Sequence, residues 1–150
     1  MKKSAISKEP KVVLSKTWAW IILIGLIILD ASLDVIFAHG SGLESPIWKP
    51  IANLLGISNP LSLTPLVLIL FYFFVKIGAW LTKKADKLPV KSEELVLTIL
   101  VIVYGIFDLW LISVYLFGFR LFRSHLYLIP ILIIIGIAYG WWAENKLKNK

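Results

Sequence analysis

Four long apolar stretches dominate this chain and set what it can fold into. They cover about residues 18–38, 65–82, 95–117 and 126–143. Each reaches or approaches the ~20 residues that a helix needs to cross ~30 Å of hydrocarbon. Hydrophobic residues make up 59% of the 150 residues, so little chain remains for a soluble catalytic domain. We therefore predict an all-α integral membrane protein, a bundle of four transmembrane helices in the lipid bilayer.

The segments outside these stretches are short and mostly polar. We predict a flexible basic tail over residues 1–16, a transmembrane domain over residues 17–144 and a second basic tail over residues 145–150. The connection between the first two stretches is the longest. Its Pro50 and Gly56 are typical of the start and the end of a short helix, which we expect to lie in the membrane interface.

Basic residues are distributed unevenly between the two sides of the predicted bundle. Twelve lie on the side that holds both chain termini and the connection between the second and third stretches, whereas three lie on the other side. Lysine and arginine accumulate on the cytoplasmic side of membrane proteins. We therefore predict a multi-pass protein of the cell membrane with both termini in the cytoplasm. This topology explains the net charge of +7, and we predict no nucleic-acid partner.

The composition also excludes several chemistries. Cysteine is absent, which excludes disulfides, thiolate metal sites and cysteine nucleophiles. The sequence contains no phosphate-binding loop and no dinucleotide-binding or nucleophile-elbow motif, so an enzyme is the less favoured class. Glutamine is absent and methionine occurs once, and depletion of such labile residues favours a thermophilic source.

Four ionisable residues interrupt the first three apolar stretches and are the main candidates for a functional site. They are Asp30, Asp34, Lys76 and Asp108. A charge at the centre of a transmembrane helix costs about 2.5–3.5 kcal/mol on insertion scales, so such residues are usually functional. At ~1.5 Å per residue, Asp30, Lys76 and Asp108 lie at a similar depth, and Asp34 lies one turn farther out.

Tyrosines follow the same helix faces as these charges. Tyr104 and Tyr115 share a stripe with Asp108, and Tyr72 lies one turn before Lys76. We expect these stripes to face one another, with the three tyrosines supporting the site.

Three carboxylates accompany a single ammonium group in the predicted interior. Lys76 could pair with Asp30 or Asp108 as a purely structural contact, or its long side chain could reach the cytoplasmic interface. In each case the excess negative charge must be neutralised by protons, by a monovalent or divalent cation or by a partner chain, because burial disfavours a charged carboxylate. We therefore expect a component of proton- or cation-coupled transport or of a channel, acting as a homo-oligomer.

Two other functions stay open. The charged face could meet charges of other membrane subunits, which would make the protein a non-enzymatic subunit or scaffold of a larger complex. A metal-dependent enzyme of the outer face is the other alternative, because imidazoles and carboxylates there suit Zn²⁺ or another divalent metal. The candidate ligands are Asp34, His39, Glu44 and His125. Their spacing matches no strong zinc signature, and two unrelated interfacial histidines are the favoured explanation.

A partial resemblance covers about half of the chain. Asp30 and Asp34, the run Gly42-Leu43-Glu44-Ser45-Pro46 and then Lys76 carry it. In these residues the chain resembles an uncharacterised family of small prokaryotic multi-pass membrane proteins, which have an aspartate in the first helix, an outer E-x-N-P or similar motif and a lysine in the second. This chain lacks the asparagine of that motif. The resemblance implies no activity.

Overall fold

The computed structural model of the protein describes residues 12–85 and 91–148, and the regular structure in these two ranges is entirely helical. Four helical segments are long and apolar enough to cross a membrane. They are α1 (Lys16–Phe37), α3 (Pro60–Ala85), α4 (Ser92–Phe117), and α5 (Leu128–Lys148) together with the short 3-10 helix η2 (His125–Tyr127) before it. The prediction of a helical fold with four apolar helices is therefore confirmed for the described part of the chain.

Two helix boundaries differ most from the sequence prediction. α3 begins at Pro60, ahead of the expected start at residue 65, because Asn59 Oδ1 accepts a hydrogen bond of 2.9 Å from the Leu61 N–H and caps the first turn. α5 continues to Lys148, so residues 145–148 of the predicted second tail are helical. The first eleven residues of the predicted N-terminal tail, and the last two residues of the chain, lie outside the described ranges.

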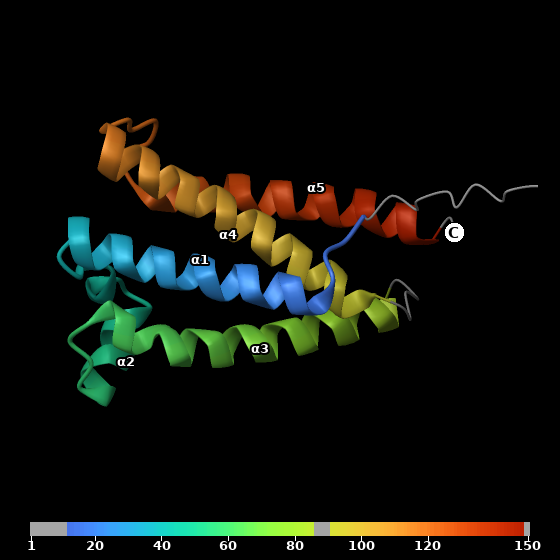
Figure 1. Ribbon diagram of the computed structural model, residues 1–150, viewed down its shortest axis with the longest axis horizontal. Coiled ribbons are helices and arrows are strands. Elements are labelled where there is room, and N and C mark those ends of the chain that lie inside the picture. Colours follow the sequence, from blue (N-terminus) through green and yellow to red (C-terminus); the bar gives the residue numbers. More distant parts are fainter. Residues whose placement is uncertain (1–11, 86–90, 149–150) are drawn as a thin grey trace, which may run out of the picture.

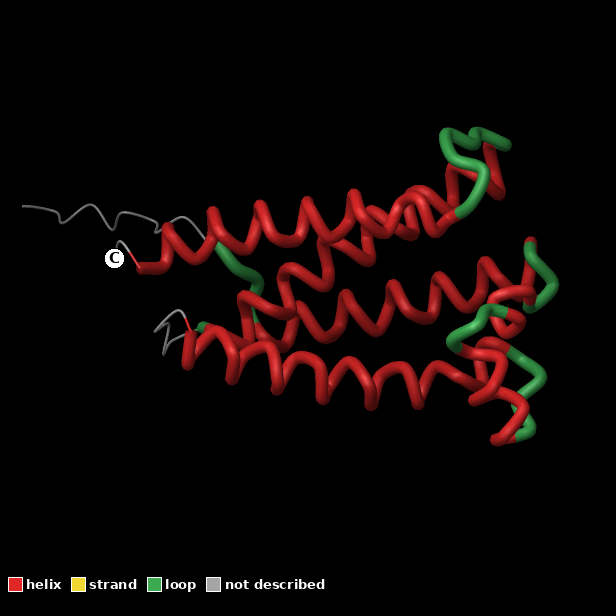
Figure 2. Tube along the Cα trace, turned by 180° about the vertical axis from the view of Figure 1, so that it is seen from behind, coloured by secondary structure: helices red, strands yellow, loops and turns green. Residues whose placement is uncertain are grey.

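Consecutive long helices run antiparallel, so α1 begins and α5 ends at the same end of the bundle (Figure 1). We call this the terminal end. The opposite end is called the loop end. It carries η1 (Ser41–Glu44) and α2 (Trp48–Leu55) in the connection between α1 and α3, and η2 in the connection between α4 and α5 (Figure 2). Tyr139 Oη donates a hydrogen bond of 2.5 Å to the Val12 carbonyl and joins the N-terminal segment to α5 at the terminal end.

α4 is the central helix, because it packs against α1, α3 and α5. Two glycines let α5 approach it closely. A Cβ atom at Gly140 would lie 3.0 Å from Ile99 Cδ1, and one at Gly136 would lie 3.3 Å from Val103 Cγ2. Small residues allow this close backbone approach between helices in a membrane, and here the contact is within one chain.

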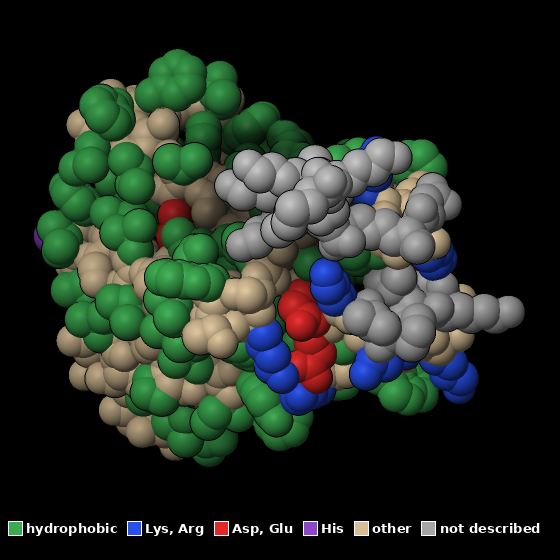
Figure 3. All heavy atoms as spheres, turned by 45° about the vertical axis from the view of Figure 1, so that its right-hand side comes forward, with side chains coloured by type: hydrophobic (Ala, Val, Ile, Leu, Met, Phe, Trp, Pro, Cys, Tyr) green, Lys and Arg blue, Asp and Glu red, His purple; other side chains and the backbone are tan. Residues whose placement is uncertain are grey.

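Two larger apolar clusters fill the bundle, one in each half, and a smaller cluster of Leu95 and Ala143 lies between α4 and α5. The cluster of the terminal half comprises Ala19, Leu23, Ile27, Val75, Val96 and Leu97. The cluster of the loop half comprises Leu33, Trp110, Leu111, Val114, Leu128 and Leu132. Large hydrophobic side chains also cover the outside of the long helices, while lysines and acidic side chains gather at the terminal end (Figure 3). A surface of this kind is stable when lipid covers it.

Candidate functional site

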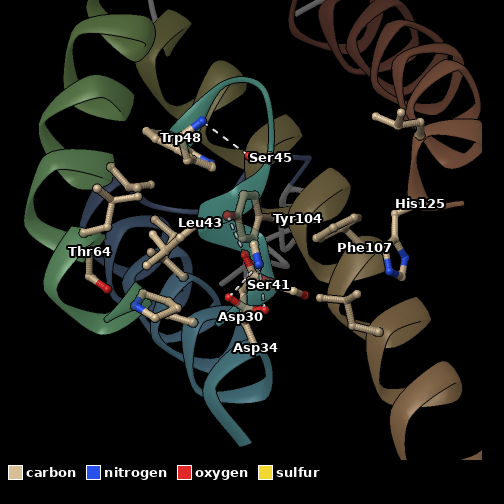
Figure 4. Close-up of a pocket in the computed structure, with 18 of the residues that line it drawn as sticks. Asp30, Asp34, Ser41, Leu43, Ser45, Trp48, Thr64, Tyr104, Phe107 and His125 are labelled. Carbon is tan, nitrogen blue, oxygen red and sulfur yellow. Dashed lines mark hydrogen bonds between the residues drawn. The ribbon is translucent and has the colours of Figure 1, made fainter. Parts of the chain in front are cut away.

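A cavity of about 520 Å³ lies at the loop end, among α1, α3 and α4 and beneath η1 and α2 (Figure 4). This volume is in the range of small-molecule sites, roughly 300–1,000 Å³. Ile27, near the middle of α1, lines the cavity and also belongs to the core of the terminal half. Because Leu23 and Leu97 of that core are fully buried, the cavity is closed toward the terminal end.

Asp30 of α1 lies deep in this cavity. Its Oδ2 accepts a hydrogen bond of 3.2 Å from the hydroxyl of Tyr104 on α4. The Tyr104 ring packs edge to face against Phe71 and Phe107, with centroid distances of 5.6 and 6.2 Å, and these contacts fix its position. The expected facing of the α1 and α4 stripes is therefore seen at Asp30 and Tyr104, and Tyr115 lines the same cavity.

Asp34 lies one turn nearer the loop end and binds η1, which covers the cavity at this end. Its Oδ1 and Oδ2 lie 3.1 and 3.2 Å from the backbone nitrogen of Gly42 in η1, which donates to both. A Cβ atom at Gly42 would lie 2.7 Å from Asp34 Oδ2, so a larger residue there would displace the Asp34 carboxylate from this contact. Asp34 thus both lines the cavity and anchors η1 on α1.

The charge of the cavity is one-sided. Its described lining contains two carboxylates, those of Asp30 and Asp34, and neither lysine nor arginine. Thr64 of α3 also lines it, and the Thr64 hydroxyl is buried without a hydrogen-bond partner among the described residues. The arrangement can accept a positively charged ligand with additional hydrogen-bonding groups.

Lys76 does not pair with Asp30 or Asp108, so that alternative of the sequence analysis is wrong. Its Nζ lies 2.6 Å from Glu93 Oε1, at the start of α4 and on the side of the terminal end. The other carboxylate oxygen of Glu93 lies 2.5 Å from the Nζ of Lys16. Figure 3 shows acidic and basic side chains side by side at this end. The carboxylates of the cavity therefore form no ion pair with Lys76.

Tyr72 lies beside Lys76, outside the site. Lys76 Nζ lies 5.6 Å from the centroid of the Tyr72 ring, and Tyr72 packs against Trp20 at 6.4 Å. Half of the Tyr72 side-chain surface is exposed, and the residue is not part of the cavity lining. Of the three expected supporting tyrosines, only Tyr104 and Tyr115 line the cavity.

Asp108 is not part of the cavity lining. It is 1% exposed, and both carboxylate oxygens lack a hydrogen-bond partner among the described residues. Gly105, three residues earlier on the same helix face, approaches Leu26 of α1, which places Asp108 on the side of α4 that faces α1. An isolated carboxylate in such surroundings is stable only as the neutral acid or beside a cation.

The predicted metal ligands do not converge. In the described ranges, no three side chains of His, Cys, Asp or Glu form a group that could hold a metal ion. Glu44 instead accepts a hydrogen bond of 2.6 Å from Lys49, which raises the pKa of that lysine. His125 Nδ1 accepts one of 3.1 Å from the indole N–H of Trp110. The predicted metal ligands Asp34, His39, Glu44 and His125 therefore do not form a metal-binding group in the described structure.

Sequence reasoning missed the part of the lining that the loops supply. Ser41, Ser45 and Trp48 reach the cavity because the segment after α1 folds back over it. No local signal marks that path. The position of Phe107 in the lining could have been predicted, since Phe107 lies one turn from Tyr104 on the same face of α4.

The fold and the cavity together define a bundle of four apolar helices with an acidic, one-sided pocket. Comparisons with protein-family models, with curated proteins and with solved structures found no match for this chain. The resemblance to the family of small prokaryotic membrane proteins therefore stays a prediction, and the function has to be argued from the site.

Proposed function

We propose that this protein is a multi-pass protein of the cell membrane that takes up a cation into the cavity at the loop end, as the first step of cation transport. The observation that carries the proposal is the lining of the cavity, which contains the carboxylates of Asp30 and Asp34 and, among the described residues, neither lysine nor arginine; the imidazole of His125, which also lines it, accepts a hydrogen bond from the Trp110 indole. Negative charge in a cleft with apolar walls attracts and concentrates cations.

The distribution of basic residues supports an outward-facing cavity. At the terminal end the described chain carries Lys16, Lys83, Lys84, Lys91, Lys146 and Lys148. At the loop end it carries Lys49, Arg120 and Arg123. Under the positive-inside rule the terminal end lies in the cytoplasm and the cavity opens outward.

Asp30 is the best-placed ligand for the cation. One of its oxygens is held by Tyr104, and the other accepts no hydrogen bond from the described residues. Both oxygens of Asp34 already accept a hydrogen bond from the Gly42 N–H. Asp34 therefore contributes negative charge at the mouth of the cavity but offers no free oxygen to the cation. The cation thus replaces the solvation that Asp30 loses on burial.

Release on the cytoplasmic side requires a rearrangement. The apolar cluster around Leu23 and Val75 fills the bundle beneath the cavity, and the contacts of Glu93 with Lys16 and Lys76 lie beneath that cluster. Four helices rarely enclose a complete path for an ion across the membrane. We propose that a second copy of the chain completes this path.

Flux through proteoliposomes tests this function. Purified protein is reconstituted, and uptake of protons, Na⁺, K⁺, Ca²⁺ and choline is measured with ion-sensitive dyes or radiolabel. We expect Asp30→Asn to abolish the flux of the transported cation. Glu44→Gln is the matched control, because it removes a carboxylate at the same end of the bundle outside the cavity lining. Equal flux in the wild type and Asp30→Asn would exclude the proposal.

A further inference from the structure

Aromatic side chains surround the carboxylates of the cavity. Tyr104 and Phe107 come from one stripe of α4, Tyr115 from two turns farther along it, and Trp48 from α2. The ring of Tyr104 is fixed beside Asp30 by its hydroxyl and by its edge-to-face packing on Phe107. A carboxylate flanked by aromatic rings is the arrangement that proteins use to bind organic ammonium ions through cation–π contacts.

The cavity suits a desolvated metal ion poorly. Ca²⁺ takes 6–8 oxygen ligands at about 2.3–2.6 Å, and a structural Zn²⁺ site takes four ligands. The described residues provide no group of three acidic or histidine side chains at any point. Asp30 offers one free oxygen and Asp34 is occupied by Gly42. A bare inorganic cation would therefore leave most of the 520 Å³ to water.

An organic cation uses the rest of the lining as well. Aliphatic side chains of α1, α3 and α4 complete the wall around the aromatic rings, among them Ile27, Leu63 and Leu111. Hydrocarbon groups of a ligand would be buried against them, at roughly 25 cal/mol per Å² of apolar surface removed from water.

We propose that the cavity binds a small organic ammonium ion, with its nitrogen beside Asp30, its positive charge against the ring of Tyr104 and its hydrocarbon part against the apolar wall. This inference rests on the proposed cation uptake and narrows it to one chemical class. Charge and shape select the ligand together, since the acidic lining rejects anions and the wide apolar wall favours an alkylated amine over a hydrated inorganic ion.

Calorimetric titration of the full-length protein in detergent tests the inference. The probes are choline, its uncharged isostere 3,3-dimethylbutan-1-ol, Na⁺, K⁺ and Ca²⁺. We expect saturable binding of choline, with the isostere and each inorganic cation at least about tenfold weaker, because a charge–ring contact with its carboxylate contributes on the order of 1–2 kcal/mol. This comparison uses only the wild type and does not depend on the folding of a variant.

Three variants locate the binding. We expect Asp30→Asn to abolish choline binding and Glu44→Gln to retain it. Tyr104→Phe keeps the ring and Tyr104→Leu removes it, so the leucine variant should bind choline several-fold more weakly than the phenylalanine variant. Equal affinities of these two variants would overturn the assigned role of the ring.

The outcomes separate this inference from the proposed function. Binding of an inorganic cation that depends on Asp30, without choline binding, overturns the ammonium class and leaves cation uptake standing. Equal affinity for choline and its uncharged isostere also overturns it, because the pocket would then recognise shape without charge. No binding of any cation that depends on Asp30 overturns both.

Discussion

Lys76 and Glu93 form an ion pair between α3 and α4, with 2.6 Å between Nζ and Oε1. The same carboxylate lies 2.5 Å from the Nζ of Lys16, so a single glutamate joins three helices at the terminal end. The pair directs the Lys76 side chain away from Asp30 and Asp108. The negative charge of the cavity follows directly from this contact.

Glu93→Gln should lower the thermal stability of the bundle. The substitution removes the negative charge that two lysines share and weakens the favourable interaction of an acidic group with the N-terminus of α4. Thermal unfolding followed by circular dichroism in detergent measures the effect. Glu94→Gln is the matched control, because Glu94 lies in the same first turn and forms no ion pair within the described residues. Equal melting temperatures for the two variants would contradict the role of Glu93.

Lys76→Met should leave the affinity for the cation unchanged within about twofold, a free-energy difference of ~0.4 kcal/mol. Lys76 lies with Glu93 and is not part of the cavity lining, so its charge does not balance Asp30. The titration described for choline gives the affinity of both proteins. A marked gain in affinity would show that Lys76 competes with the ligand for the carboxylate, and this account would fail.

Asp108→Ala should stabilise the protein by about 1–3 kcal/mol, the usual penalty for a buried polar group without a hydrogen-bond partner. Both oxygens of Asp108 are in that situation, whereas alanine is compatible with an α-helix. Unfolding in mixed micelles with increasing denaturing detergent provides the free energy. Asp34→Ala is expected to act in the opposite direction, because it deprives the Gly42 N–H of its acceptor. A less stable Asp108→Ala protein would mean that the carboxyl has a stabilising partner.

Gly140→Val should destabilise the packing of α5 on α4 by about 1–3 kcal/mol, the usual effect of overfilling a packed interface. Even a Cβ atom at Gly140 would lie 3.0 Å from Ile99, and valine adds two methyl groups to it. The same unfolding assay measures this change. Gly25→Ala is the control on α1, where a Cβ atom meets nothing within 4 Å, and we expect it to stabilise the helix slightly. Similar effects of both substitutions would argue against the close contact.

The sequence was sufficient for the parts of the fold that depend on hydrophobicity and helical period. The length of the apolar stretches predicts the four helices, and the i, i+4 stripes place Tyr104 on the face of α4 that meets α1. Depth along a helix, however, does not determine direction around it or the reach of a side chain. Lys76 has the depth of Asp30, yet its flexible side chain extends to Glu93.

The cover of the cavity was beyond prediction for a different reason. The contact between Asp34 and the Gly42 N–H depends on the path of a loop, which no periodic pattern encodes. For the same reason the expected metal ligands share one end of the bundle without meeting. Residues near the same membrane face form a site only when the loops bring them together, and here Glu44 is directed to Lys49.

The central claim is that a cation occupies the cavity beside Asp30, and protection of that carboxyl from chemical labelling tests it most directly. The protein is treated at fixed pH with dicyclohexylcarbodiimide, which modifies carboxyl groups in apolar surroundings, and the labelled positions are quantified by peptide mass spectrometry. We predict that tetramethylammonium slows labelling of Asp30 several-fold. An Asp30 labelling rate that neither tetramethylammonium nor any of Na⁺, K⁺ and Ca²⁺ alters would contradict the account.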